Sequence, residues 1–403
     1  MSQEYCQHCW PIKRTSHAPM KVSYYTKKIG HFFLAPWYWL KSKKKSRRNP
    51  NLSWNLLLEA LSLVGLIKYK SDVPEGDLHP RSGMFFDEAK KRGLDIRAAK
   101  ILGKKYTDDF RFTHNGKRYY YEAIPLTMFP NSFEMDLKWN AKSLLSKHDV
   151  PVARGKLCTD FDEALEFVQL IGYPVVAKPN NGSLSNHVTC FIANDDELAE
   201  AVQVAQAYSP AFIIEQAVEG NVYRATVVGK DAVFVSQRDR ANVVGDGVHS
   251  LQELLNIKNS DEKRAAAFTT NASVHQVPVD DITHEYLASI GMTMNSVPEA
   301  GRKVYLYSNK KYVPDRGNDI INCTAVTHED NRKLFLRVAE ILDTELVGMD
   351  FICQDISKPY YDQHAAILET NSLPFIDMHE FPSHGEGDPV SKVVWDITLA
   401  KLS

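Results

Sequence analysis

The stretch that decides the fold reads Tyr173-Pro-Val-Val-Ala-Lys-Pro179 and runs into the polar loop 180–183, Asn-Asn-Gly-Ser. A short apolar run bounded by turn-forming residues is typical of a buried strand. Lys178 stands at the end of that run. A lysine held by a rigid strand beside a flexible loop is well placed to bind phosphate oxygens. These residues alone leave open the alternative that Lys178 points into solvent.

Helices and strands alternate on both sides of this strand. The spacing of apolar residues predicts helices over 135–147, 161–171, 196–208 and 330–342, and strands over 174–178, 212–215, 222–229, 231–237, 345–353 and 364–371. Thr159 and Asp162 resemble a capping box for the second helix, and Asp195 can cap the third. Two strands in succession around Gly229-Lys-Asp231 indicate antiparallel pairing. The prediction is an α+β fold with antiparallel sheet, not a doubly wound parallel one.

A smaller α/β domain is predicted over residues 51–130. Apolar residues recur at helical spacing over 52–64, and a second helix is expected over 84–91. The sequence His114-Asn-Gly116 separates two short strand-like runs, and Asn-Gly accepts the positive φ of a tight hairpin turn. Prolines near residue 130 mark the boundary with a larger domain, 131–403.

Residues 1–50 differ from the rest of the chain in charge. They carry 11 Lys and Arg against one Glu, whereas the whole chain has 48 basic and 50 acidic residues. Trp37-Tyr-Trp39 stands beside the basic run 41–48. Basic residues next to aromatic ones could bind nucleic acid or an anionic lipid surface, but such segments are more often solvated arms. We therefore expect a basic aromatic tail outside the core.

One short motif in this tail has metal-binding chemistry. Cys6-Gln-His-Cys9, with His17 nearby, resembles half of a zinc site. No second CxxC pair follows at the spacing of a zinc finger. The sequence alone therefore does not favour a metal here.

Length and composition exclude several classes of protein. A chain of 403 residues, 44% hydrophobic and 24% charged, can form two or three domains and is neither collagen-like, coiled-coil nor wholly disordered. No apolar run is long enough to cross a bilayer. Because six cysteines occur with no recognisable signal peptide, we expect reduced thiols and a cytoplasmic protein.

A candidate metal site lies near the C-terminal end of the sequence. Asp350 falls on one predicted strand, and Glu369 and Asn371 fall on the next, on one face because they are two residues apart. Oxygen donors from adjacent strands suit Mg²⁺, which takes few protein carboxylates and completes its shell with water and phosphate oxygens. Acidic residues at strand ends are also commonly just solvated, so this pattern needs support from elsewhere in the chain.

The order of these motifs resembles the ATP-grasp superfamily, in particular the ligase module of cyanophycin synthetase and of the bifunctional glutamate-cysteine ligase/glutathione synthetase. The similarity covers about 138–395. The motifs that carry it are, in order, Lys142-Ser-Leu-Leu, Tyr173-Pro-Val-Val-Ala-Lys-Pro179, Ile214-Glu215 with Gly220 and Tyr223-Arg224, Arg238 before Val243-Val-Gly-Asp-Gly-Val-His249, Gly348-Met-Asp350, and Glu369-Thr-Asn371-Ser-Leu-Pro374 followed by Met378-His379.

The resemblance implies a fold in which two α+β subdomains clasp ATP, preceded by a small α/β domain. The residues implied to bind the nucleotide are Lys142, Lys178, Ser183, Glu215 and Val218, with the Glu215 to Val218 segment facing adenine. Those implied to hold Mg²⁺ or Mn²⁺ are Asp350, Glu369 and Asn371. Arg238 and Arg302 are candidates for cationic support of phosphoryl transfer. Arg224 and His379 are candidates for substrate contact, although each could equally make a structural ion pair or hydrogen bond.

The chain departs from the family pattern in the loop 182–188, which has Ser185 and His187 where glycines are usual. Fewer glycines reduce the freedom of a phosphate lid to adopt positive φ. Val222 replaces an acidic residue that often meets ribose, and Tyr307 replaces an arginine. These changes indicate either an altered substrate site or a module without turnover.

The sequence therefore predicts an ATP- and Mg²⁺-dependent carboxylate–amine ligase. It would join an amino acid or peptide carboxylate to an amine through an acyl phosphate. Two alternatives stay open: a non-catalytic nucleotide-binding scaffold, and an adaptor that acts through the basic tail. A homo-oligomer is compatible with the sequence.

Overall fold

The computed structural model describes residues 6, 8, 9, 14–22, 25, 52–103, 105–129, 135–269, 271–310 and 316–403. Among these residues the strands form sheets of five, four, four and two strands. Every pair of neighbouring strands in them is antiparallel. The predicted α+β class is therefore confirmed. The aromatic and basic run at 37–48 lies outside the described residues.

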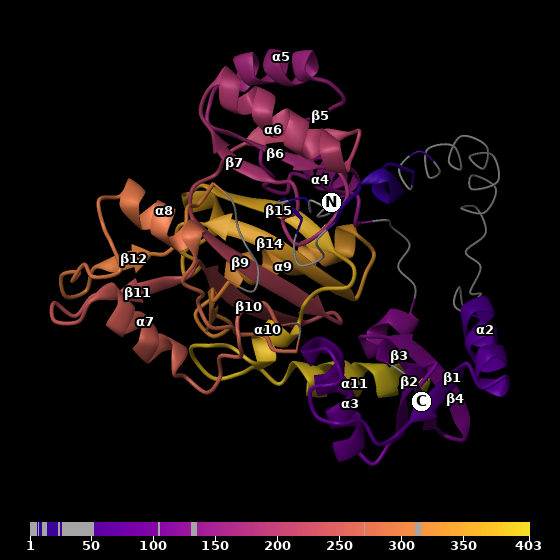
Figure 1. Cartoon of the computed structure of the whole chain (residues 1–403). Coiled ribbons are helices and arrows are strands. Elements are labelled where there is room, and N and C mark those ends of the chain that lie inside the picture. Colours follow the sequence, from indigo (N-terminus) through magenta and orange to yellow (C-terminus); the bar gives the residue numbers. More distant parts are fainter. Residues whose placement is uncertain are drawn as a thin grey trace.

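The five-stranded sheet forms the centre of the molecule (Figure 1). Its strands, in spatial order, are Asp319–Asn322 (β13), Ala232–Asp239 (β10), Asn221–Val228 (β9), Leu346–Cys353 (β14) and Ala365–Asn371 (β15). Strand β14 is buried along its whole length because it is an interior strand and helix α9 (Glu329–Ile341) covers the sheet. The rings of Phe335 on α9 and Phe351 on β14 meet edge to face, with centroids 5.1 Å apart.

A second sheet carries the stretch with which the sequence analysis began. Its strands, in spatial order, are Gly155–Cys158 (β5), Phe212–Gln216 (β8), Val175–Pro179 (β6) and Thr189–Ile192 (β7). Helices α5 (Phe161–Ile171) and α6 (Asp195–Tyr208) cover one face and enclose an apolar core. The other face points toward the central sheet (Figure 1).

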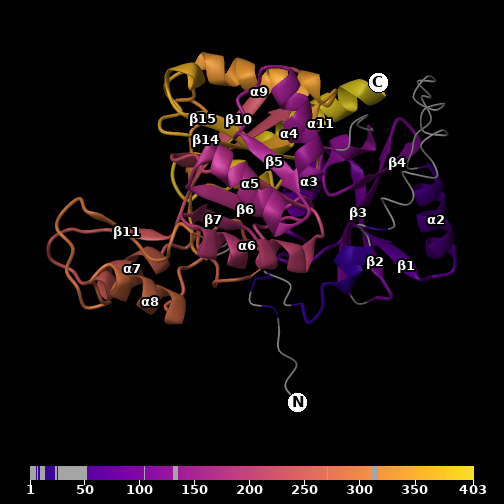
Figure 2. The same ribbon diagram turned by 90° about the horizontal axis from the view of Figure 1, so that it is seen from above.

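A third unit is the N-terminal sheet, which Figures 1 and 2 show to one side of the other two. Its elements are α2 (Leu52–Leu63), β1 (Ile67–Lys70), α3 (Pro80–Lys91), β2 (Asp95–Ile101), β3 (Lys105–His114) and β4 (Lys117–Glu122). Asn115 and Gly116 form the predicted turn with φ of 50° and 72°. Helix α3 begins four residues before the predicted start at 84 because Pro80 occupies its first turn and the His79 ring caps it.

The last helix of the chain, α11 (Val390–Leu402), packs against this N-terminal unit. Trp395 is fully buried, and its ring meets Phe112 edge-on with centroids 5.0 Å apart. Its Nε1 donates a hydrogen bond of 2.9 Å to the Phe85 carbonyl. The same apolar core contains residues of the central sheet, so the N-terminal unit shares its core with the rest of the molecule. The division of the chain at residue 130 stays a prediction.

A small outlying lobe projects from the central sheet at the left of Figure 1. Its elements are β11 (Asn242–Val244), α7 (Leu251–Asn259), α8 (Asp281–Ser289) and β12 (Lys303–Tyr305). In the described part of the chain no helix combines the length and the apolar character that a bilayer crossing needs.

Two predicted helix caps are wrong by one residue. Asp160, not Thr159, caps α5 by accepting a hydrogen bond from the backbone of Glu163. Asn194, not Asp195, caps α6 in the same way. In both cases a neighbouring polar residue could also cap a helix, and the backbone geometry of the preceding strand decides between them.

We expect Trp395→Phe to lower the free energy of unfolding by about 2 kcal/mol, because it leaves a gap in the core and removes the donor from the Phe85 carbonyl. Urea denaturation followed by circular dichroism measures this. Leu170→Ala is the control, since that side chain is 67% exposed on α5. A variant as stable as the unsubstituted chain would show that α11 does not hold the N-terminal unit in place.

Candidate active site

Three charged side chains are buried together at the inner face of the second sheet. Helix α4 (Lys138–Lys147) supplies Lys142, β6 supplies Lys178 and β8 supplies Glu215. The Nζ atoms of Lys142 and Lys178 lie 2.7 Å and 2.6 Å from the two carboxylate oxygens of Glu215. Each side chain is 7% exposed or less. One carboxylate therefore pairs with two ammonium groups, and the trio carries a net positive charge.

The pKa values of this trio reflect burial and mutual charge. Burial raises the pKa of Glu215, but the charges of Lys178 and Lys142 together outweigh burial. The pKa of Glu215 is therefore lowered, and the carboxyl stays ionised. Burial lowers the pKa of Lys142, and the neighbouring Lys178 charge lowers it again, against the opposing effect of Glu215. An additional anion at this place would be stabilised, because one carboxylate cannot neutralise two buried cations.

A second group of charges runs in a row across the central sheet. Asp350 on β14 pairs in register with Arg224 on β9 and with Glu369 on β15, so the three side chains share one face. Arg224 Nε donates to Asp350 Oδ1 at 2.7 Å, and Arg238 Nη2 of β10 donates to Oδ2 at 2.6 Å. Asn371 lies two residues along from Glu369, opposite Gly348 and on the same face.

Lys138 joins this row although the sequence analysis did not single it out. Its Nζ lies 3.0 Å from Glu369 Oε2 and donates to the carbonyl of Gly182 at 2.8 Å. Burial raises the pKa of Glu369, but Lys138, Lys178 and Arg224 together bring that pKa well below its usual range. Lys138 stands four residues before Lys142 on α4, and this i, i+4 spacing was the signal available in the sequence.

The two groups of charges meet at a cleft of about 640 Å³ between the sheets. Lys178 Nζ donates to the carbonyl of Leu368, next to Glu369, at 3.1 Å and so links the two sheets. The predicted site residues that line the cleft are Lys178, Ser183, Glu215, Val218, Arg238, Asp350 and Glu369. Two larger hollows, of about 750 and 820 Å³, are lined by none of these residues. The volume of the cleft is in the range of small-molecule sites.

Three predicted residues have side-chain surroundings that differ from the expected contacts. Arg302, expected beside a transferring phosphate, is exposed in the turn before β12 and does not line the cleft. The Glu215 carboxylate, expected near adenine, is held between two lysines. Their positive charges attract it more strongly than a neutral group would. The His379 ring is fully buried and accepts or donates hydrogen bonds of 2.8 Å with the hydroxyls of Thr226 and Ser236.

Arg224 and His379 thus have the structural interactions that the sequence analysis left open as an alternative. Burial, with a contribution from Arg224, lowers the pKa of His379 to about 3. The Nη1 atom of Arg224 is nevertheless buried without a hydrogen-bond partner among the described residues. A buried unpaired guanidinium nitrogen is costly unless a ligand pairs with it.

The loop 182–188 borders the cleft and adopts an unusual backbone. Ser185 and His187, which replace expected glycines, have φ of 53° and 60°. Left-handed backbone costs a non-glycine residue roughly 1 kcal/mol. The loop therefore keeps the glycine-like conformation in spite of its sequence, contrary to the loss of positive φ that the replacements suggested.

A divalent cation fits the oxygen donors of this site. The Asp350 carboxylate accepts two hydrogen bonds and Glu369 makes one ion pair among the described residues, which leaves part of the roughly four acceptor positions of each carboxylate unused. Asn371 adds an amide oxygen, and its amide nitrogen is buried with no hydrogen-bond partner in the part of the chain that the structure describes. Oxygen donors of this kind suit Mg²⁺ or Mn²⁺.

Several known proteins are similar to this chain in sequence or in structure. Residues 138–224 match the family described as carbamoyl-phosphate synthase L chain, ATP binding domain. Cyanophycin synthetase of Trichormus variabilis is 29% identical over 329 residues, which cover 80% of this chain and 35% of that protein. A bifunctional glutathione synthetase from Pasteurella multocida has a crystal structure that matches with a TM-score of 0.62 and 23% identity, over 81% of this chain and 44% of that one. The chain has an ATP-grasp fold and is homologous to the ATP-grasp ligases.

A third comparison extends the match to another ligase. The glutathione biosynthesis bifunctional protein GshAB of Clostridium perfringens is 26% identical over 328 residues, covering 80% of this chain and 41% of that protein. The ATP-grasp chain thus spans between about a third and a half of the length of these relatives. Within it, Tyr307 is 1% exposed and belongs to the core of the outlying lobe, so its side chain does not line the cleft.

We expect Glu215→Gln to lower the free energy of unfolding by about 3 kcal/mol at neutral pH, because two buried ammonium groups lose their only charged partner in the trio. Urea denaturation measures the change. Glu166→Gln is the matched control, since that carboxylate is 79% exposed beside Lys156 and should contribute little. Equal effects of the two substitutions would contradict the buried-trio interpretation.

The depressed pKa of His379 predicts a specific acid sensitivity. Between the ordinary value of 6.5 and the folded value of about 3, the unfolded state binds a proton that the folded state does not. The stability contributed by His379 is therefore complete above pH 6.5 and decreases as the pH falls, by about 1.4 kcal/mol per unit.

The measurement compares the unsubstituted chain with His379→Gln by urea denaturation at several pH values. The difference in unfolding free energy between the two should shrink between pH 6.5 and 4.5. His148→Gln, at an exposed position, is the control for replacing a histidine as such. A difference that stays constant with pH for His379→Gln would exclude a buried neutral imidazole.

Proposed function

We propose that this chain is an ATP- and Mg²⁺-dependent carboxylate–amine ligase that forms an amide or peptide bond. The observation that carries the proposal is the meeting of two groups of paired cations and carboxylates at one cleft. Lys142, Glu215 and Lys178 form one group, and Asp350 with Glu369 forms the other. The homology to ATP-grasp ligases supports the same assignment.

In this proposal the lysine pair holds the phosphates of ATP. The trio of Lys142, Glu215 and Lys178 has one positive charge in excess, and a phosphate oxygen supplies the missing anion. Lys138 and Ser183, at the border of the cleft, add a cation and a hydroxyl donor. The segment 216–220 lines the same cleft and would present backbone groups to the adenine.

Asp350, Glu369 and Asn371 would hold Mg²⁺, which supplies charge neutralisation for phosphate oxygens. Arg238 lies beside Asp350 and lines the cleft, so its guanidinium can stabilise charge on the transferring phosphoryl group. Because Arg238 is already paired with Asp350, its guanidinium is oriented before substrate binds. Such preorganisation lowers the cost of stabilising charge during the reaction.

The chemistry proceeds in two steps on the substrates. A carboxylate oxygen of the first substrate attacks the γ-phosphorus, the bond to the β-phosphate oxygen breaks, and ADP leaves. The nitrogen of the amine then attacks the acyl carbon, phosphate departs with the former carboxylate oxygen, and the nitrogen loses a proton. Phosphorylation is needed because the oxide of a free carboxylate is a poor leaving group.

A non-catalytic nucleotide-binding scaffold is the second candidate. The replacement of two glycines in the loop 182–188 favours it, because a lid with fewer glycines closes less freely. The left-handed φ of Ser185 and His187 weakens that argument, since the backbone keeps the shape that glycine would give.

Release of ADP separates the two candidates. The purified chain is incubated with ATP and pools of amino acids or short peptides, with Mg²⁺ or with EDTA. A ligase releases ADP and phosphate only when both a carboxylate and an amine substrate and Mg²⁺ are present. Binding of ATP without substrate-dependent ADP release would identify a scaffold, and the absence of ATP binding would overturn both.

We expect Lys178→Ala to weaken ATP binding, and Glu369→Gln to lower kcat at least about 100-fold with a smaller effect on ATP affinity, because the second removes charge needed mainly during phosphoryl transfer. Calorimetric titration with ATP and coupled ADP assays give the two quantities. Lys333→Ala is the control, since this lysine is 64% exposed on α9. Unchanged activity in either cleft variant would contradict the assigned roles.

A further inference from the structure

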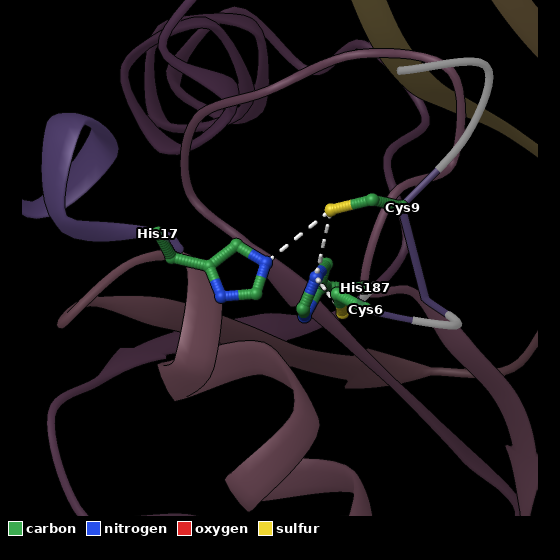
Figure 3. Close-up of side chains that lie close together, drawn as sticks. All are labelled: Cys6, Cys9, His17 and His187. Carbon is green, nitrogen blue, oxygen red and sulfur yellow. Dashed lines mark hydrogen bonds between the residues drawn. The ribbon is translucent and has the colours of Figure 1, made fainter. Parts of the chain in front are cut away.

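Four side chains from distant parts of the sequence converge beside the loop 182–188 (Figure 3). Cys6, Cys9 and His17 come from the N-terminal segment, and His187 comes from the loop. Their sulfur and imidazole nitrogen atoms all lie within 4.8 Å of one another. Cys9 and His187 are 5% and 1% exposed, so the cluster is largely shielded from water.

The individual distances are those of a ligand shell. Cys9 Sγ lies 3.3 Å from His17 Nε2 and 3.4 Å from His187 Nε2, and Cys6 Sγ lies 3.5 Å from the same His187 nitrogen. Around a tetrahedral zinc ion with ordinary bond lengths, neighbouring sulfur and nitrogen ligands are about 3.5 Å apart. The four side chains point toward one another in Figure 3, as ligands of one ion do.

The tautomer of a neutral His187 ring is set by a contact outside the cluster. Its Nδ1 lies 2.6 Å from the carbonyl oxygen of Val204. A carbonyl only accepts, so Nδ1 carries the hydrogen and Nε2 presents a lone pair to the two cysteines. A hydrogen bond from the second ring nitrogen to a carbonyl is the usual arrangement for a metal-binding histidine.

The sulfurs of both cysteines crowd one imidazole nitrogen. Nε2 of His187 has one lone pair in this tautomer, and the sulfurs of Cys6 and Cys9 both lie within 3.5 Å of it. That lone pair can accept a hydrogen bond from only one thiol at a time. A central cation, by contrast, binds both thiolates and both imidazoles at once.

We propose that Cys6, Cys9, His17 and His187 form a structural zinc site that fastens the N-terminal segment to the loop 182–188. Two thiolates and two imidazoles are donors that select zinc among common divalent ions. A complete set of four protein ligands leaves no open position, which is typical of structural rather than catalytic zinc. The CxxC motif at Cys6 and Cys9 lacks a second pair of ligands nearby in the sequence. His187, which is 178 residues from Cys9, completes that pair with His17.

The proposal also explains the backbone of the loop. His187 keeps a left-handed φ of 60° where glycine would be unstrained, because its imidazole is needed as a ligand. Zinc would hold the loop beside the cleft and limit its motion. If the loop is a nucleotide lid, zinc would thus affect nucleotide binding, and this consequence rests on the proposed function. The zinc site itself does not rest on it.

The test uses the full chain and zinc alone. The protein is stripped with EDTA, reconstituted with zinc chloride under reducing conditions and desalted, and bound zinc is counted by atomic emission. We expect about one zinc per chain and a higher melting temperature for the reconstituted protein. Reconstitution with Co²⁺ should give the absorption bands of a tetrahedral thiolate site, a readout that needs no substitution.

Matched variants locate the ligands. Cys9→Ser and His187→Gly should each lower bound zinc at least about fivefold. Cys323→Ser changes a cysteine outside the cluster, and Ser185→Gly relieves the same backbone strain in the same loop, so both should retain the metal. Far-ultraviolet circular dichroism checks that all four variants are folded.

Hydrogen exchange gives a second readout that does not involve catalysis. Exchange of the amides in 183–188 should accelerate when zinc is removed from the unsubstituted chain, and not in His187→Gly. The proposal is overturned if the reconstituted chain holds no zinc or if Cys9→Ser retains the metal fully. It is also overturned if the mass of the intact chain is lower by two hydrogens because Cys6 and Cys9 form a disulfide. If a variant loses zinc but still releases ADP, the ligase assignment stands. If the chain binds zinc but releases no ADP with any substrate, the zinc site stands and the ligase assignment fails.

Discussion

Much of this structure depends on one buried carboxylate, Glu215, between two lysines. Burying an ionised group costs several kcal/mol, and a single salt bridge seldom compensates for that cost. Here the carboxylate meets one lysine from a helix and one from a neighbouring strand. The positions of α4, β6 and β8 are therefore tied to each other by charge as well as by apolar packing, and the excess cation of the trio faces the cleft.

The central sheet repeats this arrangement of a carboxylate between two cations. Asp350 lies between the guanidinium groups of Arg224 and Arg238, and Glu369 pairs with Lys138. Each carboxylate is thus oriented by cations before any ligand arrives. Since Lys178 also reaches the backbone of β15 at Leu368, the two sheets are connected across the cleft by hydrogen bonding at its floor.

The sequence predicted most of the elements and much of the cleft, because both depend on short-range patterns. The strand before Lys178, the Asn115-Gly116 turn and helix α5 follow from local periodicity and turn chemistry. The roles of the cleft residues stay predictions. Arg302 shows the limit of this reasoning, since its place in an exposed turn depends on how the outlying lobe folds.

The zinc-like cluster shows a second limit. His187 follows Cys9 by 178 residues, which include the whole N-terminal sheet. In the sequence it reads only as a departure from a glycine-rich loop. A ligand that completes a motif from so far away is visible only in three dimensions. The same holds for the hydroxyls of Thr226 and Ser236, which hydrogen-bond the His379 ring without any spacing that marks them as partners.

The packing of Trp395 on the backbone of Phe85 has a consequence for biosynthesis. These residues are 310 positions apart, and they belong to one apolar core. On the ribosome, the N-terminal sheet emerges long before the helix that covers it. Its apolar face therefore stays exposed to chaperones and to neighbouring nascent chains until α11 has been translated.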